Sequence, residues 1–191
     1  MSKKIFAVAL AVLQCAGCAW TAQSVKISPE VKSTSSLTGN GKSVQMTVVD
    51  ERSSKVIGQR GVGTVGADMT VEGDLQTIVT NALVEGLGKH DFKVSSQPQN
   101  LAARLRIEIR NLSSKNIMGF FAGTLRDEFG LKALCKSASG VEYEKLFNGL
   151  FETSLQVVPT GDANDRYISA AVSDAVNQLV NDDELLKCLA E

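Results

Sequence analysis

The glycines at Gly61, Gly63 and Gly66 form the pattern in this chain that most resembles a cofactor-binding motif. G-x-G-x-x-G holds a dinucleotide pyrophosphate when it lies at a strand-to-helix junction, because the helix N-terminus then faces the phosphates. The next predicted helix begins at Asp74, well past the last glycine, so we interpret the stretch as a loop. Gly41-Lys42-Ser43 resembles the end of a phosphate-binding loop, but it lacks the first glycine of that motif and precedes a strand.

Nucleophilic, acid–base and metal chemistry would need a cluster of residues that this chain does not present in sequence. His90 is the only histidine, and it stands at the end of a predicted helix, where a positive charge is favoured by the helix dipole. We therefore predict a capping or exposed role for it. Asp182, Asp183 and Glu184 form an acidic run at a predicted helix start, which favours capping over calcium binding or catalysis. We predict no catalytic residue, no metal site and no enzyme activity.

The N-terminus has the build of a secretory signal peptide. Lys3 and Lys4 give it a positive start, and an unbroken apolar run follows from Ile5 to Leu13. The run is too short to cross a bilayer, which needs about 20 residues. We predict that residues 1–17 are a cleaved leader.

Ala16-Gly17-Cys18 resembles the bacterial lipobox, in which the cysteine becomes the lipidated first residue of the mature chain. The small residues let the peptidase seat the backbone, and the thiol carries the lipid. Cys15 stands where this motif usually has leucine. The alternative is ordinary cleavage after Ala19, because Gly17 and Ala19 are both small. With lipidation, the lipid on Cys18 is the only cofactor-like group that we expect, and Ala19 in place of aspartate favours the outer membrane.

Composition fits one soluble domain and disfavours nucleic acid as a partner. The chain has 20 basic and 21 acidic residues, and loss of the leader removes two lysines, so the mature domain is slightly acidic. Cys135 and Cys188 remain beyond the anchor. In an oxidising periplasm they form either a disulfide or two separate buried thiols, because a disulfide demands a strict geometry that sequence does not give.

Hydrophobic periodicity predicts a two-layer α+β domain. We expect residues 18–43 to form a lipidated tether, with a short edge strand at Ser24–Ile27, and residues 44–191 to form the periplasmic domain. Alternation in Ala103–Leu112 indicates a strand with one buried and one wet face, which suits an antiparallel sheet. The predicted domain has an antiparallel sheet of about four to five strands with two main helices on one face. Strands are expected at 44–50, 92–94, 103–112, 125–136 and 141–157, and helices at 74–88, 165–180 and around 185–189.

One apolar stretch between two predicted strands could reach a partner. Ile117, Met118, Phe120 and Phe121 lie in the sequence IMGFFAG. They either pack under the sheet as a local core or form an exposed patch that contacts a partner or the membrane surface.

The order of elements resembles the YajG-type family of bacterial lipoproteins. The pieces that carry the resemblance are the CAGC anchor, the strand SVKISPEV, the strand MTVVDER, the helix ahead of Phe92-Lys93-Val94, the strand ARLRIEIRNL and the closing Ala/Val-rich helix. The resemblance implies an outer-membrane lipid anchor, a domain facing the periplasm and no established enzyme activity.

These observations predict a non-enzymatic lipoprotein of the bacterial outer membrane. Its expected partners are the membrane, through the lipid on Cys18, and other envelope proteins. The alternatives are a carrier that holds a small ligand or lipid between helices and sheet, and an accessory subunit of an outer-membrane transport or assembly complex.

Overall fold

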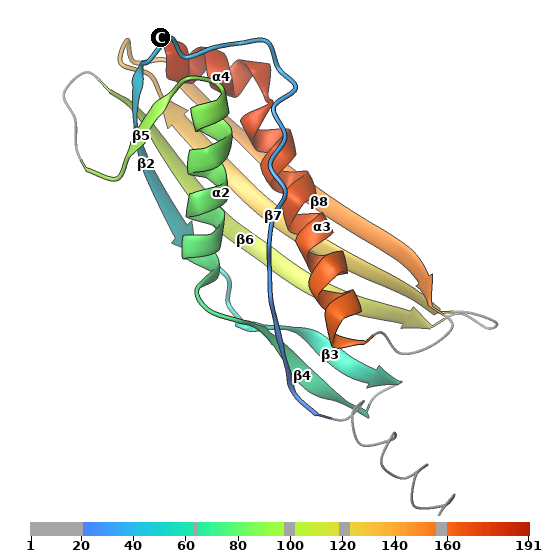
Figure 1. Cartoon of the computed structure of the whole chain (residues 1–191). Coiled ribbons are helices and arrows are strands. Elements are labelled where there is room, and N and C mark those ends of the chain that lie inside the picture. Colours follow the sequence, from blue (N-terminus) through green and yellow to red (C-terminus); the bar gives the residue numbers. More distant parts are fainter. Residues whose placement is uncertain (1–20, 63–64, 98–101, 119–122, 156–159) are drawn as a thin grey trace, which may run out of the picture.

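The computed structural model describes residues 21–62, 65–97, 102–118, 123–155 and 160–191. They form a long, curved sheet with helices packed on one face, as Figure 1 shows. The leader and Cys18 lie outside the described residues. In chain order the elements are β1 (Gln23–Val25), β2 (Ser43–Asp50), β3 (Val56–Val62), β4 (Val65–Val71), α2 (Leu75–Lys89), β5 (Lys93–Ser95), β6 (Ala103–Met118), β7 (Gly123–Lys136), β8 (Glu142–Leu155), α3 (Gly161–Val180) and α4 (Asp183–Ala190).

Over the described residues the sheet is mixed and has eight strands, so the expected antiparallel sheet of four to five strands is wrong. β6, β7 and β8 form an antiparallel meander. The other edge of β6 is shared by two strands that both run parallel to it: β2 pairs with its first half, and β3 pairs with it at Ser114. The alternation of apolar and polar residues in β6 shows which face of the strand is buried, but it does not show the direction of the neighbouring strands. One face of β6 is open to solvent although its neighbours on one edge are parallel, so the sequence pattern suggested an antiparallel sheet.

Both long helices cover the same face of the sheet. α2 begins after Asp74, whose carboxylate accepts a hydrogen bond from the Thr77 N–H at 2.9 Å, as the sequence predicts. α3 begins at Gly161, earlier than expected, because Thr160 and not Asp165 is its N-cap. No helix among the described residues combines the length and apolarity that a bilayer crossing requires.

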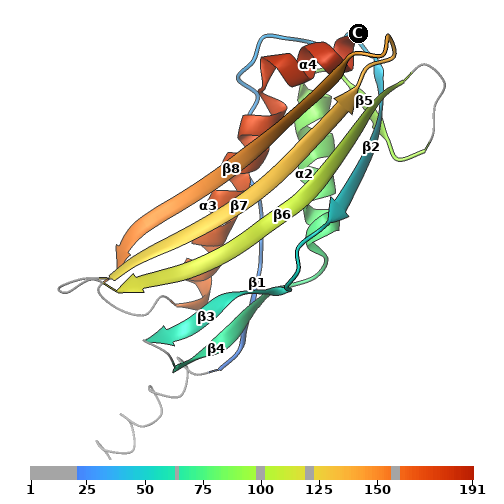
Figure 2. The same cartoon turned by 180° about the vertical axis from the view of Figure 1, so that it is seen from behind.

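The core lies between the helices and the inner face of the sheet. Figure 2 shows the opposite face of β6, β7 and β8 without any helix over it. Packing is close at two glycines, one between α2 and α3 and one between α3 and β8. A Cβ on Gly86 would lie 2.6 Å from a methyl carbon of Val180, and one on Gly149 would collide with the Ala171 carbonyl oxygen. At these two points the elements pack too closely for a ligand to lie between them.

Candidate functional site

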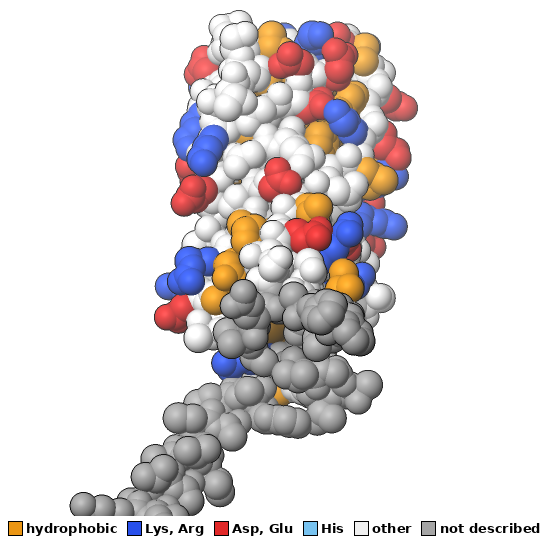
Figure 3. Space-filling model, turned by 90° about the vertical axis from the view of Figure 1, so that its right-hand side faces the viewer, with side chains coloured by type: hydrophobic (Ala, Val, Ile, Leu, Met, Phe, Trp, Pro, Cys, Tyr) orange, Lys and Arg blue, Asp and Glu red, His pale blue; other side chains and the backbone are white. Residues whose placement is uncertain are grey.

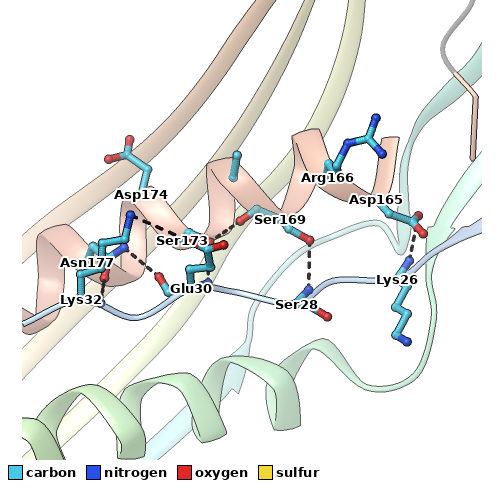
Figure 4. A pocket seen from close by; sticks show the side chains of 11 residues that line it. Lys26, Ser28, Glu30, Lys32, Asp165, Arg166, Ser169, Ser173, Asp174 and Asn177 are labelled. Atoms are coloured by element: carbon cyan, nitrogen blue, oxygen red, sulfur yellow. Dashed lines mark hydrogen bonds and ion pairs between the residues drawn. The ribbon is translucent and has the colours of Figure 1, made fainter. Parts of the chain in front are cut away.

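Helix α3 and its C-cap residue carry a row of five polar side chains on one stripe of the helix surface. Each follows the previous one by four residues, and residues at that spacing lie above one another on a helix. The row consists of Asp165, Ser169, Ser173, Asn177 and Asn181. The close-up in Figure 4 shows the first four beside the extended chain that follows β1.

The extended chain donates alternate backbone N–H groups to this row. Its residues are Lys26, Ser28, Glu30, Lys32 and Thr34, and the N···O distances are 3.1, 3.0, 2.9, 2.7 and 2.5 Å in that order. Two extended residues advance about 6.7 Å, and four helical residues advance about 6 Å, so the two repeats nearly match. The side chains of α3 therefore replace the neighbouring strand that this segment lacks.

Side chains of the two helices also donate hydrogen bonds to backbone carbonyl oxygens of this segment. Asn177 Nδ2 donates to the Glu30 carbonyl oxygen at 2.9 Å, and Asn181 Nδ2 donates to that of Lys32 at 2.7 Å. From α2, Lys89 Nζ donates to the Val31 carbonyl oxygen at 2.7 Å. The segment thus lies between α2 and α3 (Figure 1), and much of the expected 18–43 tether is packed on the domain.

A groove open to solvent runs between this segment and α3. Basic Lys26, Lys32 and Arg166 line it together with acidic Glu30 and Asp174 and other residues of the row. The charges are mixed, so the groove has no clear preference for an anion or a cation. The hydroxyls of Ser169 and Ser173 already accept backbone N–H groups, which makes them structural groups and poor candidates for nucleophiles.

His90 holds the next part of the segment in place. Its side chain is buried, so the exposed alternative is excluded, and it follows α2 as the C-cap residue. Nδ1 lies 2.9 Å from the Leu37 carbonyl oxygen, which can only accept a hydrogen bond, so Nδ1 carries the proton. Nε2 lies 3.2 Å from the Ser33 hydroxyl oxygen, within hydrogen-bond distance. Both ring nitrogens are used in structural contacts.

The acidic run at 182–184 caps α4. Asp182 accepts the Leu185 N–H at 2.8 Å, the Tyr143 hydroxyl at 2.7 Å and Lys145 Nζ at 2.6 Å. Burial alone would raise the pKa of Asp182, but these hydrogen bonds outweigh it and the pKa is lowered. Burial and the Asp182 carboxylate raise the pKa of Tyr143. Among the described residues no group of three or more potential ligands could hold a metal ion.

The remaining predicted site residues fall into three places. Cys135 on β7 and Cys188 on α4 are joined by a disulfide with an S–S distance of 2.07 Å. Ile117 is half exposed near the end of β6, and Met118 is the last residue of that strand. Phe120 and Phe121 lie outside the described residues, as does Cys18.

Two buried charged sites were missed from the sequence. Arg52 donates to Asp50 through Nε and Nη2 at 2.9 Å each, which holds the pKa of Asp50 well below its ordinary range. Asp127 on β7 is 1% exposed, and neither carboxylate oxygen has a hydrogen bond of normal length. Burial raises its pKa to about 6, and the Ser114 hydroxyl, directly across the strand pair, opposes the rise in part. In the sequence, Asp127 stands between Leu125 and Phe129 at an inward position of the alternating pattern, and this could have indicated that its side chain is buried.

A family model described as "Uncharacterized lipoprotein" matches residues 29–190. The chain belongs to this family. It is therefore a bacterial lipoprotein of the cell envelope, and this part of the sequence prediction is confirmed. A comparison with curated proteins found no match.

Solved structures add a likeness of fold. A Xanthomonas campestris protein of the DUF330 family is 16% identical, with a TM-score of 0.54 over 86% of this chain and 96% of that one. A Helicobacter pylori homolog of the neuraminyllactose-binding hemagglutinin is 11% identical, with a TM-score of 0.48 over 86% and 95%. A minor lipoprotein from Acinetobacter baumannii is 12% identical, with a TM-score of 0.41 over 71% and 92%. At such identities only the first likeness is informative, and it concerns the fold alone.

Proposed function

We propose that this lipoprotein is of the YajG type, that lipid on Cys18 anchors it in the outer membrane, and that its periplasmic domain binds other envelope proteins without catalysing a reaction. The family supports the anchor. The lipobox-like sequence and Ala19 support the outer membrane as the address. The serines, histidine and acidic run considered above are all engaged in structural contacts, which supports a binding role.

The observation that carries the binding role is the exposed apolar pair on the open sheet face, by which we mean the side of β6, β7 and β8 that bears no helix. Leu146 and Leu150 on β8 are 59% and 45% exposed. Between them lies Asn148, and the residue opposite Asn148 on β7 is Gly130, which has no side chain. The Asn148 side chain lies over this glycine, with Oδ1 3.4 Å from where a Cβ would stand, so the two leucines flank a polar position on the open sheet face.

Charged pairs lie on the same sheet face as these leucines. Lys132 contacts Glu144 at 2.6 Å, and Lys136 contacts Glu142 at 2.9 Å, in both cases across β7 and β8. Figure 3 views the molecule from the right-hand side of Figure 1, edge-on to the sheet, and there hydrophobic side chains form small separate areas among charged ones. A few apolar anchors within a polar rim are typical of specific protein interfaces and unlike a continuous lipid-binding surface.

Photo-crosslinking in cells tests this proposal. A photoreactive amino acid would replace Leu146 or Leu150 in the full chain, and Val84, which is 41% exposed on α2, would serve as the matched control. We expect discrete adducts with envelope proteins from the two sheet positions and none of these from Val84. The same adducts from all three positions, or none from the sheet, would contradict binding through this face.

A further inference from the structure

The pairing register places the start of β1 near one end of the long sheet. Gln23 pairs with Met69 on β4, which pairs with Gly58 on β3. Gly58 pairs in turn with Ser114 on β6. Gln23 is therefore level with Ser114, and β6 continues only to Met118, about 13 Å further. The chain thus joins the domain close to the end where β6 finishes and β7 begins, as the lower part of Figure 2 shows.

The direction of β1 carries the preceding residues towards this same end. β1 runs parallel to β4, β4 runs antiparallel to β3, and β3 runs parallel to β6. β1 is therefore antiparallel to β6, so the residues before Gln23 leave in the direction in which β6 ends. The Gln23 side chain fixes this exit, because Nε2 donates to the Gly161 carbonyl oxygen at 3.1 Å and Oε1 accepts from buried Asn164 at 2.8 Å.

We propose that this end of the domain, which we call the anchor pole, lies against the phospholipid headgroups while the sheet extends away from the membrane. The inference rests on the lipid anchor proposed above. Only four residues lie between Cys18 and Gln23, and the five Cα–Cα steps from one to the other span at most about 18 Å. The anchor pole cannot move further than this from the bilayer surface. The opposite pole carries the Cys135–Cys188 disulfide and α4 (Figure 1).

The described side chains of the anchor pole suit a headgroup region. Ile117 is half exposed there, and Lys115 and Arg126 place cationic groups beside it on the open sheet face. Both cations also contact Glu128, at 3.8 and 2.7 Å, so the surface is mildly basic and not a strong anion site. The short connection to the lipid, more than electrostatic attraction, holds this pole at the membrane.

Ile117 and Val141 form a matched pair of reporter positions. They are 50% and 47% exposed, and both are apolar. Ile117 pairs with Thr124 at the start of β7, whereas Val141 follows the turn after Lys136 at the end of that strand. The twelve residues from Thr124 to Lys136 set the two positions about 40 Å apart along the sheet.

The experiment measures how strongly a headgroup-attached nitroxide quenches a fluorophore at each position. Full-length lipidated protein with Ile117→Cys or Val141→Cys would be labelled and placed in vesicles of phosphatidylethanolamine and phosphatidylglycerol. We expect quenching at 117 to exceed that at 141 several-fold. A twelve-residue Gly/Ser insertion after Trp20 should reduce the quenching at 117, because such a linker adds about 20 Å of reach. Neutron reflectometry of the unsubstituted protein should give a layer about 50 Å thick, the length of β6.

The possible failures separate the inference from the proposed function. The protein must first be shown to float with the vesicles. The inference that the anchor pole lies against the headgroups is then overturned by equal quenching at both positions, by weak quenching at both, or by no response to the insertion. Mass spectrometry of the same preparation tests the anchor itself, and an unmodified residue 18 would overturn both proposals together.

Discussion

The disulfide between Cys135 and Cys188 should contribute a large part of the stability of the domain. It closes a loop with a sequence separation of 53 residues. The chain-entropy relation for a loop of this length gives a stabilisation of about 4 kcal/mol at 25 °C. The bond ties α4 to the end of β7, so its loss should free α4 before the rest of the core.

Urea unfolding of the same polypeptide with and without dithiothreitol measures this contribution. The domain would be produced from Ala19 onwards, so that Cys135 and Cys188 are its only cysteines. We expect reduction to lower the unfolding midpoint by roughly 2 M urea, for an m-value near 2 kcal/mol/M. The melting temperature should fall by roughly 10 °C.

The control is the Cys135→Ala/Cys188→Ala variant, whose unfolding should not respond to dithiothreitol. A thiol assay in denaturant should find no free thiol in the oxidised domain. The reasoning is refuted if oxidised and reduced domains unfold at the same urea concentration, or if the oxidised domain contains two reactive thiols.

Three further substitutions test the polar contacts of the fold by urea unfolding. Asn177→Ala removes two hydrogen bonds to the N-terminal segment and should cost about 1–2 kcal/mol, whereas Arg166→Ala on the same helix should change the free energy by less than about 0.5 kcal/mol; equal effects would contradict a role for the polar row. The folded-state pKa of Asp127 is raised to about 6, so its charge destabilises the fold increasingly as pH rises from about 4 to 6. Asp127→Asn should therefore gain up to about 3 kcal/mol at pH 7 and nothing at pH 4, and a gain independent of pH would exclude this cause. The pKa of Asp50 is lowered, so the stability that it provides is present above about pH 4 and is lost on acidification. At pH 7 Asp50→Ala should cost about 3–5 kcal/mol, and the double variant with Arg52→Met should cost less; the reverse order would contradict a buried pair.

Elements whose own residues determine their limits could be predicted from the sequence. Asp74 indicated the start of α2, because its side chain caps the helix from a neighbouring position in the chain. The alternation of apolar and polar residues in Ala103–Leu112 indicated β6, although the strand continues to Met118. The direction of neighbouring strands could not be predicted, because the parallel partner of β6 is β2, more than fifty residues earlier in the chain.

The N-terminal segment shows a second limit of sequence analysis. It has little apolar periodicity, and we expected a tether there. Its partners are side chains of α3 far along the chain, for example Ser28 with Ser169. The four-residue repeat of polar residues in α3 is visible in the sequence, but a polar stripe on a helix usually faces water. Only the fold shows that this stripe faces a backbone, and Asn177, which both donates and accepts, is the side chain that best signals it.

The most direct test of the central claim is the mass of the N-terminal peptide of the mature protein from cell membranes. Attachment of the domain to the envelope through residue 18 predicts that the mature chain begins at Cys18 and carries acyl chains, and that Cys18→Ala abolishes both the modification and membrane retention. A mature chain that begins after Ala19, carries no lipid and is recovered in the soluble periplasmic fraction would contradict the account.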